Sequence, residues 1–94
     1  MLIFKNDKNG NNIWTKKTEK CRYMSVATDK NGEVYIVGQN SNYPTTIDGI
    51  NLGKTFLVKL NGNDGSINYT KSFDFGSYQF IPVLDKQNNL YVFT

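Results

Sequence analysis

Two copies of the tetrapeptide Asp-Lys-Asn-Gly, at residues 7–10 and 29–32, have the composition of a calcium-binding loop. Such a loop needs further oxygen ligands and a bidentate Glu about six residues after the glycine. Lys16 and Gly38 occupy those positions, so the closing ligand is missing from both copies. An Asp that opens a turn accepts hydrogen bonds from the backbone that follows, and Asn-Gly tolerates positive φ. Both copies are therefore predicted to be hairpin turns, and no metal site is expected.

The other reactive side chains form no catalytic pattern. There is no His, which excludes Ser-His and Cys-His pairs and histidine metal ligands. Cys21 lies between Lys20 and Arg22, whose charges favour the thiolate, but no second catalytic group accompanies it. The eight acidic residues are spread along the chain, with no pair placed for glycoside hydrolysis. We therefore predict that the protein is not an enzyme and binds no cofactor.

The charge pattern argues against several partners. The net charge is only +3, and the one basic cluster, Lys16, Lys17, Lys20 and Arg22, is interrupted by Glu19. This pattern is typical of a solvated face and lacks the basic stripe of a nucleic-acid site. No apolar run is long enough to span a membrane. The opening "MLIF" is too short for the apolar part of a signal peptide, so the cell compartment stays open.

The elements that would position any site are predicted to be strands. Aromatic and β-branched residues are plentiful, and no stretch keeps a helical apolar period. Eight short apolar runs are bounded by Gly, Asn or Asp, at 2–6, 12–17, 23–28, 33–39, 55–61, 66–73, 79–85 and 89–94. Pro82 cannot donate to a ladder, so its run is expected to be an edge, a bulge or a shorter strand. Residues 40–54 are predicted to be a long irregular loop.

The sequence contains an internal repeat. "DKNGEVYIVG" at 29–38 returns as "DKQNNLYVFT" at 85–94, a shift of 56 residues. Lys5 matches Lys59 with a shift of 54, and Trp14 matches Tyr69 with a shift of 55. The chain is therefore expected to be a single all-β segment over 1–94, with one repeat at about 2–39, the loop 40–54 and a second repeat at about 55–94.

These repeats resemble the bacterial seven-bladed β-propeller repeat family. The resemblance lies in "FLVKLNGNDGSINYTKSF" followed by "FIPVLDKQNNLYVFT", and in "NGNNIWTKK" followed by "YMSVATDKNGEVYIVG". Asn88, Asn89 and Tyr69 depart from the usual glycine, small polar residue and tryptophan. The resemblance implies antiparallel four-stranded blades, with two blade equivalents in this chain. It also implies a scaffold for binding or display, outside the cell or at its surface.

The resemblance fixes where each blade begins. Residues 23–73 would form one complete blade, while 2–17 would lack its inner strands and 79–94 its outer strands. Open edges of this kind invite pairing with another chain. Either identical chains join head to tail, about three or four copies closing a ring, or further blades belong to a longer protein. The principal hypothesis is accordingly a structural or interaction module.

A binding role is the alternative hypothesis. In a propeller, the loops between strands two and three and between successive blades lie on one face. The residues placed there by the resemblance are Arg22, Asn42, Tyr43, Asp48, Asp74 and Tyr78. Aromatic faces and amides suit a sugar or a peptide. The alternative is thus a carbohydrate-binding lectin with one site per blade.

Overall fold

The computed structural model describes residues 1–39, 44–73 and 80–93, which contain strands and turns and no helix. The strands are β1 (Leu2–Asn6), β2 (Asn12–Glu19), β3 (Tyr23–Thr28), β4 (Val34–Gln39), β5 (Thr46–Ile47), β6 (Ile50–Asn51), β7 (Thr55–Leu60), β8 (Ile67–Phe73), β9 (Ile81–Leu84) and β10 (Leu90–Phe93). The predicted all-β class is confirmed. Within these ranges, no helix is long and apolar enough to cross a membrane.

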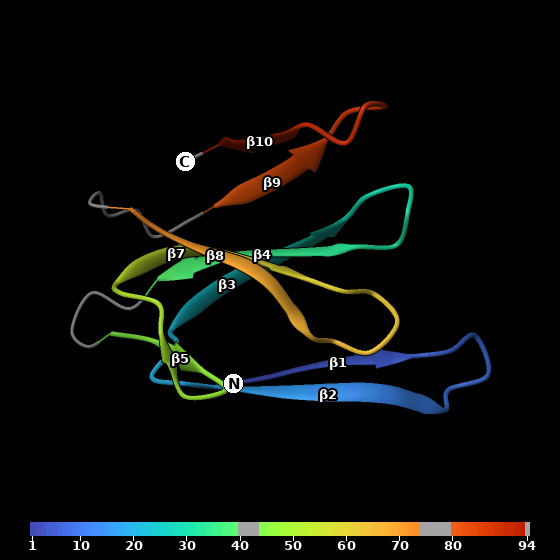
Figure 1. The fold of residues 1–94 in the computed structure, drawn as a ribbon, viewed down its shortest axis with the longest axis horizontal. Helices are drawn as coiled ribbons and strands as arrows, with labels where there is room; N and C mark the ends of the chain where they lie inside the picture. Colours follow the sequence, from blue (N-terminus) through green and yellow to red (C-terminus); the bar gives the residue numbers. More distant parts are fainter. Residues whose placement is uncertain (40–43, 74–79, 94) are drawn as a thin grey trace.

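The strands form three open antiparallel sheets. The middle sheet has the order β3-β4-β7-β8 and covers the range 23–73 that was predicted to hold four strands. A second sheet has the order β1-β2-β5-β6, and β9 pairs with β10 alone. Figure 1 shows the middle sheet between the other two, with the β1–β2 hairpin on one side and the β9–β10 hairpin on the other. We call these two hairpins the N-terminal and C-terminal half-sheets.

Each face of the middle sheet builds its own hydrophobic core. Ile36 and Val58 face the N-terminal half-sheet, where they join Ile3 and Trp14 in one buried cluster. Tyr35, Val37 and Leu57 face the other way and pack with Phe80, with Leu84 and Leu90 at the margin. All six residues of β4 are buried, because this central strand is covered on both faces. Its uninterrupted apolar run is typical of such a strand.

The hairpin turns repeat one hydrogen-bonding device. Asp29 Oδ1 accepts the backbone N–H groups of Asn31 and Glu33 at 2.9 and 3.0 Å. Asp85 Oδ1 does the same for the two equivalent residues at 2.9 Å each, and Asp7 holds its own turn alike. Gly10 and Gly32 have φ of 89° and 82°, so the turn prediction is confirmed. Asn88 takes the same left-handed conformation (φ 64°), which Asn tolerates better than most residues.

The 40–54 segment and the strand that contains Pro82 were both singled out from the sequence. The 40–54 segment is not wholly irregular, because β5 and β6 lie in it: β5 pairs with β2 through two residue pairs, and β6 pairs with β5. Asp48 and Gly49 have φ of 50° and 78°, the geometry that suits a two-residue hairpin. The expectation for Pro82 is confirmed: β9 is shortened to four residues, and only β10 pairs with it among the described strands.

Candidate functional site

The six residues assigned to the loop face are only partly placed. Asn42, Tyr43, Asp74 and Tyr78 lie outside the described residues. Arg22 is exposed in the connection before β3, and its guanidinium lies 5.5 Å from the ring centre of Tyr23. Asp48 lies in the β5–β6 turn and forms an ion pair with Lys16. Arg22 and Asp48 are thus engaged with different neighbours, and no shared ligand geometry follows from them.

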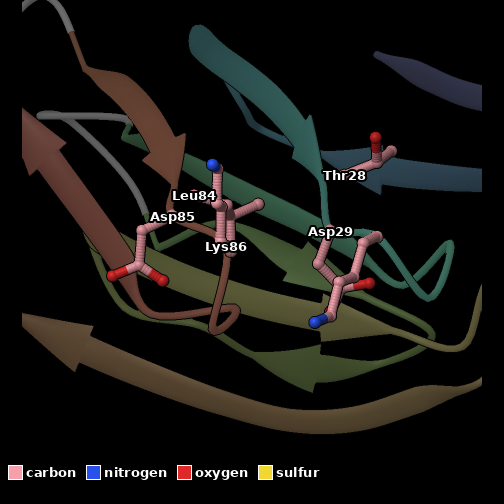
Figure 2. Close-up of a pocket in the computed structure, with 6 residues that line it drawn as sticks. Thr28, Asp29, Leu84, Asp85 and Lys86 are labelled. Atoms are coloured by element: carbon pink, nitrogen blue, oxygen red, sulfur yellow. The ribbon is translucent and has the colours of Figure 1, made fainter.

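A cavity of about 660 Å³ lies between two of the repeated turns. Figure 2 shows Asp29 and Asp85 on separate turns, at opposite ends of this open pocket. Each carboxylate already accepts hydrogen bonds from its own turn and from a tyrosine hydroxyl. Backbone hydrogen bonding, chiefly from Asn89, lowers the pKa of Asp85. The carboxylates therefore maintain the turns, and the pocket gathers no catalytic pair.

Metal and thiol chemistry find no further support. In the part of the chain that the structure describes, no three His, Cys, Asp or Glu side chains come together to hold a metal ion. Burial raises the pKa of the Cys21 thiol, which makes the reactive thiolate scarcer despite the neighbouring cations. Cys21 instead packs against the core beside the N-terminal half-sheet.

The most distinctive surface is the outer face of the C-terminal half-sheet. Cross-strand pairing joins Ile81 to Phe93 and Val83 to Tyr91. All four side chains are exposed, with Tyr91 at 52% and Phe93 at 58%. A hairpin of two strands is marginally stable by itself. An apolar face on such a hairpin indicates a surface that another element covers.

The N-terminal half-sheet has a matching apolar face. Leu2 and Phe4 project from β1 away from the core that holds Ile3, and Phe4 is 60% exposed. β1 is also the first strand of its sheet, and among the described strands only β2 pairs with it. Both half-sheets therefore combine exposed apolar side chains with an edge whose backbone groups are open to pairing.

Two apolar cavities lie beside these half-sheets. The first, of about 320 Å³, borders the C-terminal half-sheet and is lined by Tyr69, Phe73, Phe80, Leu90 and Val92, among others. We call it the C-side cavity. The second, of about 400 Å³, borders the N-terminal half-sheet and is lined in part by Phe4, Trp14, Val26, Thr28 and Val34. We call it the N-side cavity.

A tyrosine accompanies the turn in both copies of the repeat. Tyr35 donates its hydroxyl to Asp29 at 3.1 Å, and Tyr91 donates to Asp85 at 3.2 Å. In the middle sheet, the ammonium of Lys59 lies 5.3 Å from the ring centre of Tyr35. Burial raises the pKa of Tyr35. The interaction between the Lys59 ammonium and the Tyr35 hydroxyl raises the pKa of Lys59. The sequence repeat matches Lys59 of the middle sheet with Lys5, which lies on β1 of the N-terminal half-sheet.

The loop-face prediction missed these strand surfaces. The signal was present in "LIF" at 2–4 and "LYVF" at 90–93, where apolar residues follow one another without alternation. Such runs indicate strands that are covered on both faces, whereas one face of each remains open here. Comparison with protein-family models, with curated proteins and with solved structures found no match.

Proposed function

We propose that the chain is a structural assembly module, a β-propeller segment whose two half-sheets are completed by further blades in identical chains or in a longer protein. The role is scaffolding or display, and the working parts are the open half-sheets. The proposal assigns no chemical step to the protein.

One observation carries this proposal: within the described residues, each half-sheet has both an edge strand without a second partner and an exposed apolar face. Exposed edges with apolar side chains are an aggregation hazard that natural proteins cover. Here the hazard occurs twice, on opposite sides of the middle sheet (Figure 1). A heterologous contact of this kind joins unlike surfaces and propagates until a ring closes.

The propeller part of the proposal is supported by the internal repeat and by the four-stranded middle sheet. Four antiparallel strands in sequential order are the unit from which propellers repeat. The middle sheet is covered on both faces by neighbouring sheets, as a blade inside a ring would be. The lectin alternative stays a prediction, since no feature of the described residues favours a sugar site. The expectation that the protein is not an enzyme also stays a prediction.

The solution mass of the 94-residue chain, measured by light scattering after size-exclusion chromatography, tests the proposal. A discrete oligomer supports assembly between identical chains. A chain that aggregates or lacks stable structure supports completion by further blades of a longer protein. A folded monomer with both half-sheets ordered would overturn the proposal, because the open edges would then need no partner.

A further inference from the structure

We propose that β10 of one chain pairs antiparallel with β1 of a second copy, with Tyr91 opposite Lys5. This inference rests on the assembly function proposed above and names its partner and register. The C-terminal half-sheet of one copy and the N-terminal half-sheet of the next then form one composite sheet, in which β9, β10, β1 and β2 follow one another and β5 and β6 extend the β2 side.

The middle sheet supplies the template, because its two hairpins match the two half-sheets in detail. In β3–β4, Ala27 pairs with Tyr35, and in β9–β10 the equivalent Val83 pairs with Tyr91. The match between β7–β8 and β1–β2 extends to an irregularity. The register shifts after Lys59 in one hairpin and after Lys5 in the other. Each half-sheet therefore has the strand geometry of one half of the middle sheet.

The β4–β7 ladder then gives the register between copies. Within the chain, Tyr35 lies opposite Lys59 and Ile36 opposite Val58. The repeat shifts of 56 for β10 and 54 for β1 transfer this ladder to the open edges. The resulting pairs are Leu90 with Asn6, Tyr91 with Lys5, Val92 with Phe4, and Phe93 with Ile3.

This register places the exposed side chains of the C-terminal half-sheet over the N-side cavity of the second copy. Ile3 faces its own middle sheet, so Phe93 beside it would face the same way. Residues opposite each other in a ladder share a face of the sheet, and Tyr91 lies two residues from Phe93. Val26, exposed in the single chain, lines the cavity that these side chains would fill.

The other face of the composite sheet meets the C-side cavity of the first copy. Val92 faces this cavity, and Phe4 of the second copy would lie directly beside it. Leu2 follows two residues from Phe4 on the same face. The cavity wall includes Tyr69 and Phe73, which are exposed in the single chain and would be covered by this hairpin. The register that the β4–β7 ladder gives therefore places apolar side chains at both cavities.

The proposed register also reproduces, at the contact between copies, the Lys–Tyr arrangement of the middle sheet. Lys59 lies over Tyr35, whose hydroxyl binds Asp29. Tyr91 keeps the bond to Asp85, and the proposed pairing brings Lys5 to the position beside it. Lys5 already donates to the carbonyl oxygen of Gly62 at 2.6 Å, which holds its side chain on the face that Tyr91 would share.

The occupant that we assign to each open edge is a second copy, because the repeat makes β1 and β10 complementary to each other. β1 and β10 lie on opposite sides of the middle sheet and make no contact in the described structure (Figure 1). The chain nevertheless presents both complementary halves, so each copy offers one edge to the copy before it and one to the copy after it. A ring of about three or four copies would pair β1 and β10 of every copy.

Disulfide trapping tests the register. Val92→Cys and Phe4→Cys are combined in a chain in which Cys21→Ser removes the native thiol, and oxidation is followed on non-reducing gels. Opposed residues in antiparallel strands lie within disulfide range. We expect covalent multimers that form about tenfold or more faster than random collision allows, since neighbours in a ladder have effective concentrations in the millimolar range.

The matched control is Tyr91→Cys with Phe4→Cys. A shift of one residue places the two thiols on opposite faces, so this pair should cross-link no faster than random collision. Mixing a Val92→Cys chain with a Phe4→Cys chain should give the heterodimer, which proves that the bond joins two copies. Equal cross-linking by both pairs, in an oligomer of unchanged mass, would overturn the register and leave the assembly function standing. A monomer without cross-links would overturn both.

A second variant does not depend on disulfide geometry. Phe93→Asp changes a side chain that is exposed in the single chain, so its circular dichroism should be unchanged while the oligomer dissociates. Ile50→Asp, on exposed β6 away from both open edges, is the control and should keep the oligomer. An oligomer that survives Phe93→Asp would contradict the proposed contact.

Discussion

The β3–β4 hairpin and the β9–β10 hairpin share a repeated sequence pattern but have different surroundings. Both have an Asp that accepts the same turn N–H groups and a Tyr that donates to that Asp. Tyr35 is only 4% exposed, because it lies between β7 and the C-terminal half-sheet, whereas Tyr91 is 52% exposed. The local turn therefore forms from its own residues, while burial depends on the neighbour that completes the sheet.

The β1–β2 hairpin and the β7–β8 hairpin, which also match in the repeat, differ in burial in the same way. Trp14 of β2 is buried, its indole N–H donates to Gly62 at 3.1 Å, and its ring contacts the backbone at Gly65. Tyr69 is its counterpart in β8 and is 37% exposed. The difference follows from position, since the middle sheet covers Trp14 and no element of the described chain covers Tyr69 in the same way. Substitutions at matched positions should expose this asymmetry.

The largest expected effect comes from Ile36→Ala compared with Val92→Ala. Ile36 is fully buried in the middle sheet, so its truncation should cost about 2–5 kcal/mol of unfolding free energy. Val92 is its repeat counterpart and partly exposed, so Val92→Ala should cost about 1 kcal/mol or less in the single chain. Urea denaturation of both variants at low protein concentration measures the difference. Equal costs would contradict the contrast between covered and open hairpins.

A smaller effect is expected for Trp14→Phe compared with Tyr69→Phe. The first change removes the indole hydrogen bond and part of a buried ring, and should cost about 1–2 kcal/mol. The cost stays moderate because Lys5 also donates to the Gly62 carbonyl, which keeps that oxygen satisfied. Tyr69→Phe should stay within about 0.5 kcal/mol, as for most exposed positions. Thermal unfolding by circular dichroism compares the two, and a larger loss for Tyr69→Phe would reverse the predicted order.

The smallest effect concerns acid stability at the exposed turns. Backbone hydrogen bonds, chiefly from Asn11 and Asn89, hold the pKa values of Asp7 and Asp85 below their ordinary range in the folded state. A lowered folded pKa contributes stability above the unfolded pKa, and that stability is lost as the pH falls below about 4. The variant Asp7→Asn/Asp85→Asn keeps the amide oxygen as an acceptor but cannot titrate. Its melting temperature should therefore fall less between pH 5 and about pH 3 than that of the parent chain.

The sequence predicts the strands well because Gly, Asn and Asp mark almost every turn. The eight predicted runs match β1–β4 and β7–β10 with small shifts at their ends. β5 and β6 were missed because two residues are too few to show alternation, although Asp48-Gly49 is a strong hairpin signal. The site was harder, since the loop-face residues came from a resemblance. The apolar faces of the half-sheets could be recognised only from the structure, in which Ile3 and Tyr35 are buried while Phe4 and Tyr91 are exposed.

Amide hydrogen exchange in β10, compared with β4 over a range of protein concentrations, tests the central claim most directly. The Asp85–Asn89 hydrogen bond and the β9–β10 register direct the N–H groups of Tyr91 and Phe93 toward β9, whereas those of Leu90 and Val92 face the open edge. Once a second copy supplies β1, protection at Leu90 and Val92 should therefore rise with concentration toward that at Val34 and Ile36, their counterparts in β4. The β4 amides, paired within the chain, should change little over the same range. Protection in β10 that stays low at every concentration, or is already as high as in β4 in the monomer, would contradict completion of the half-sheet by a second copy.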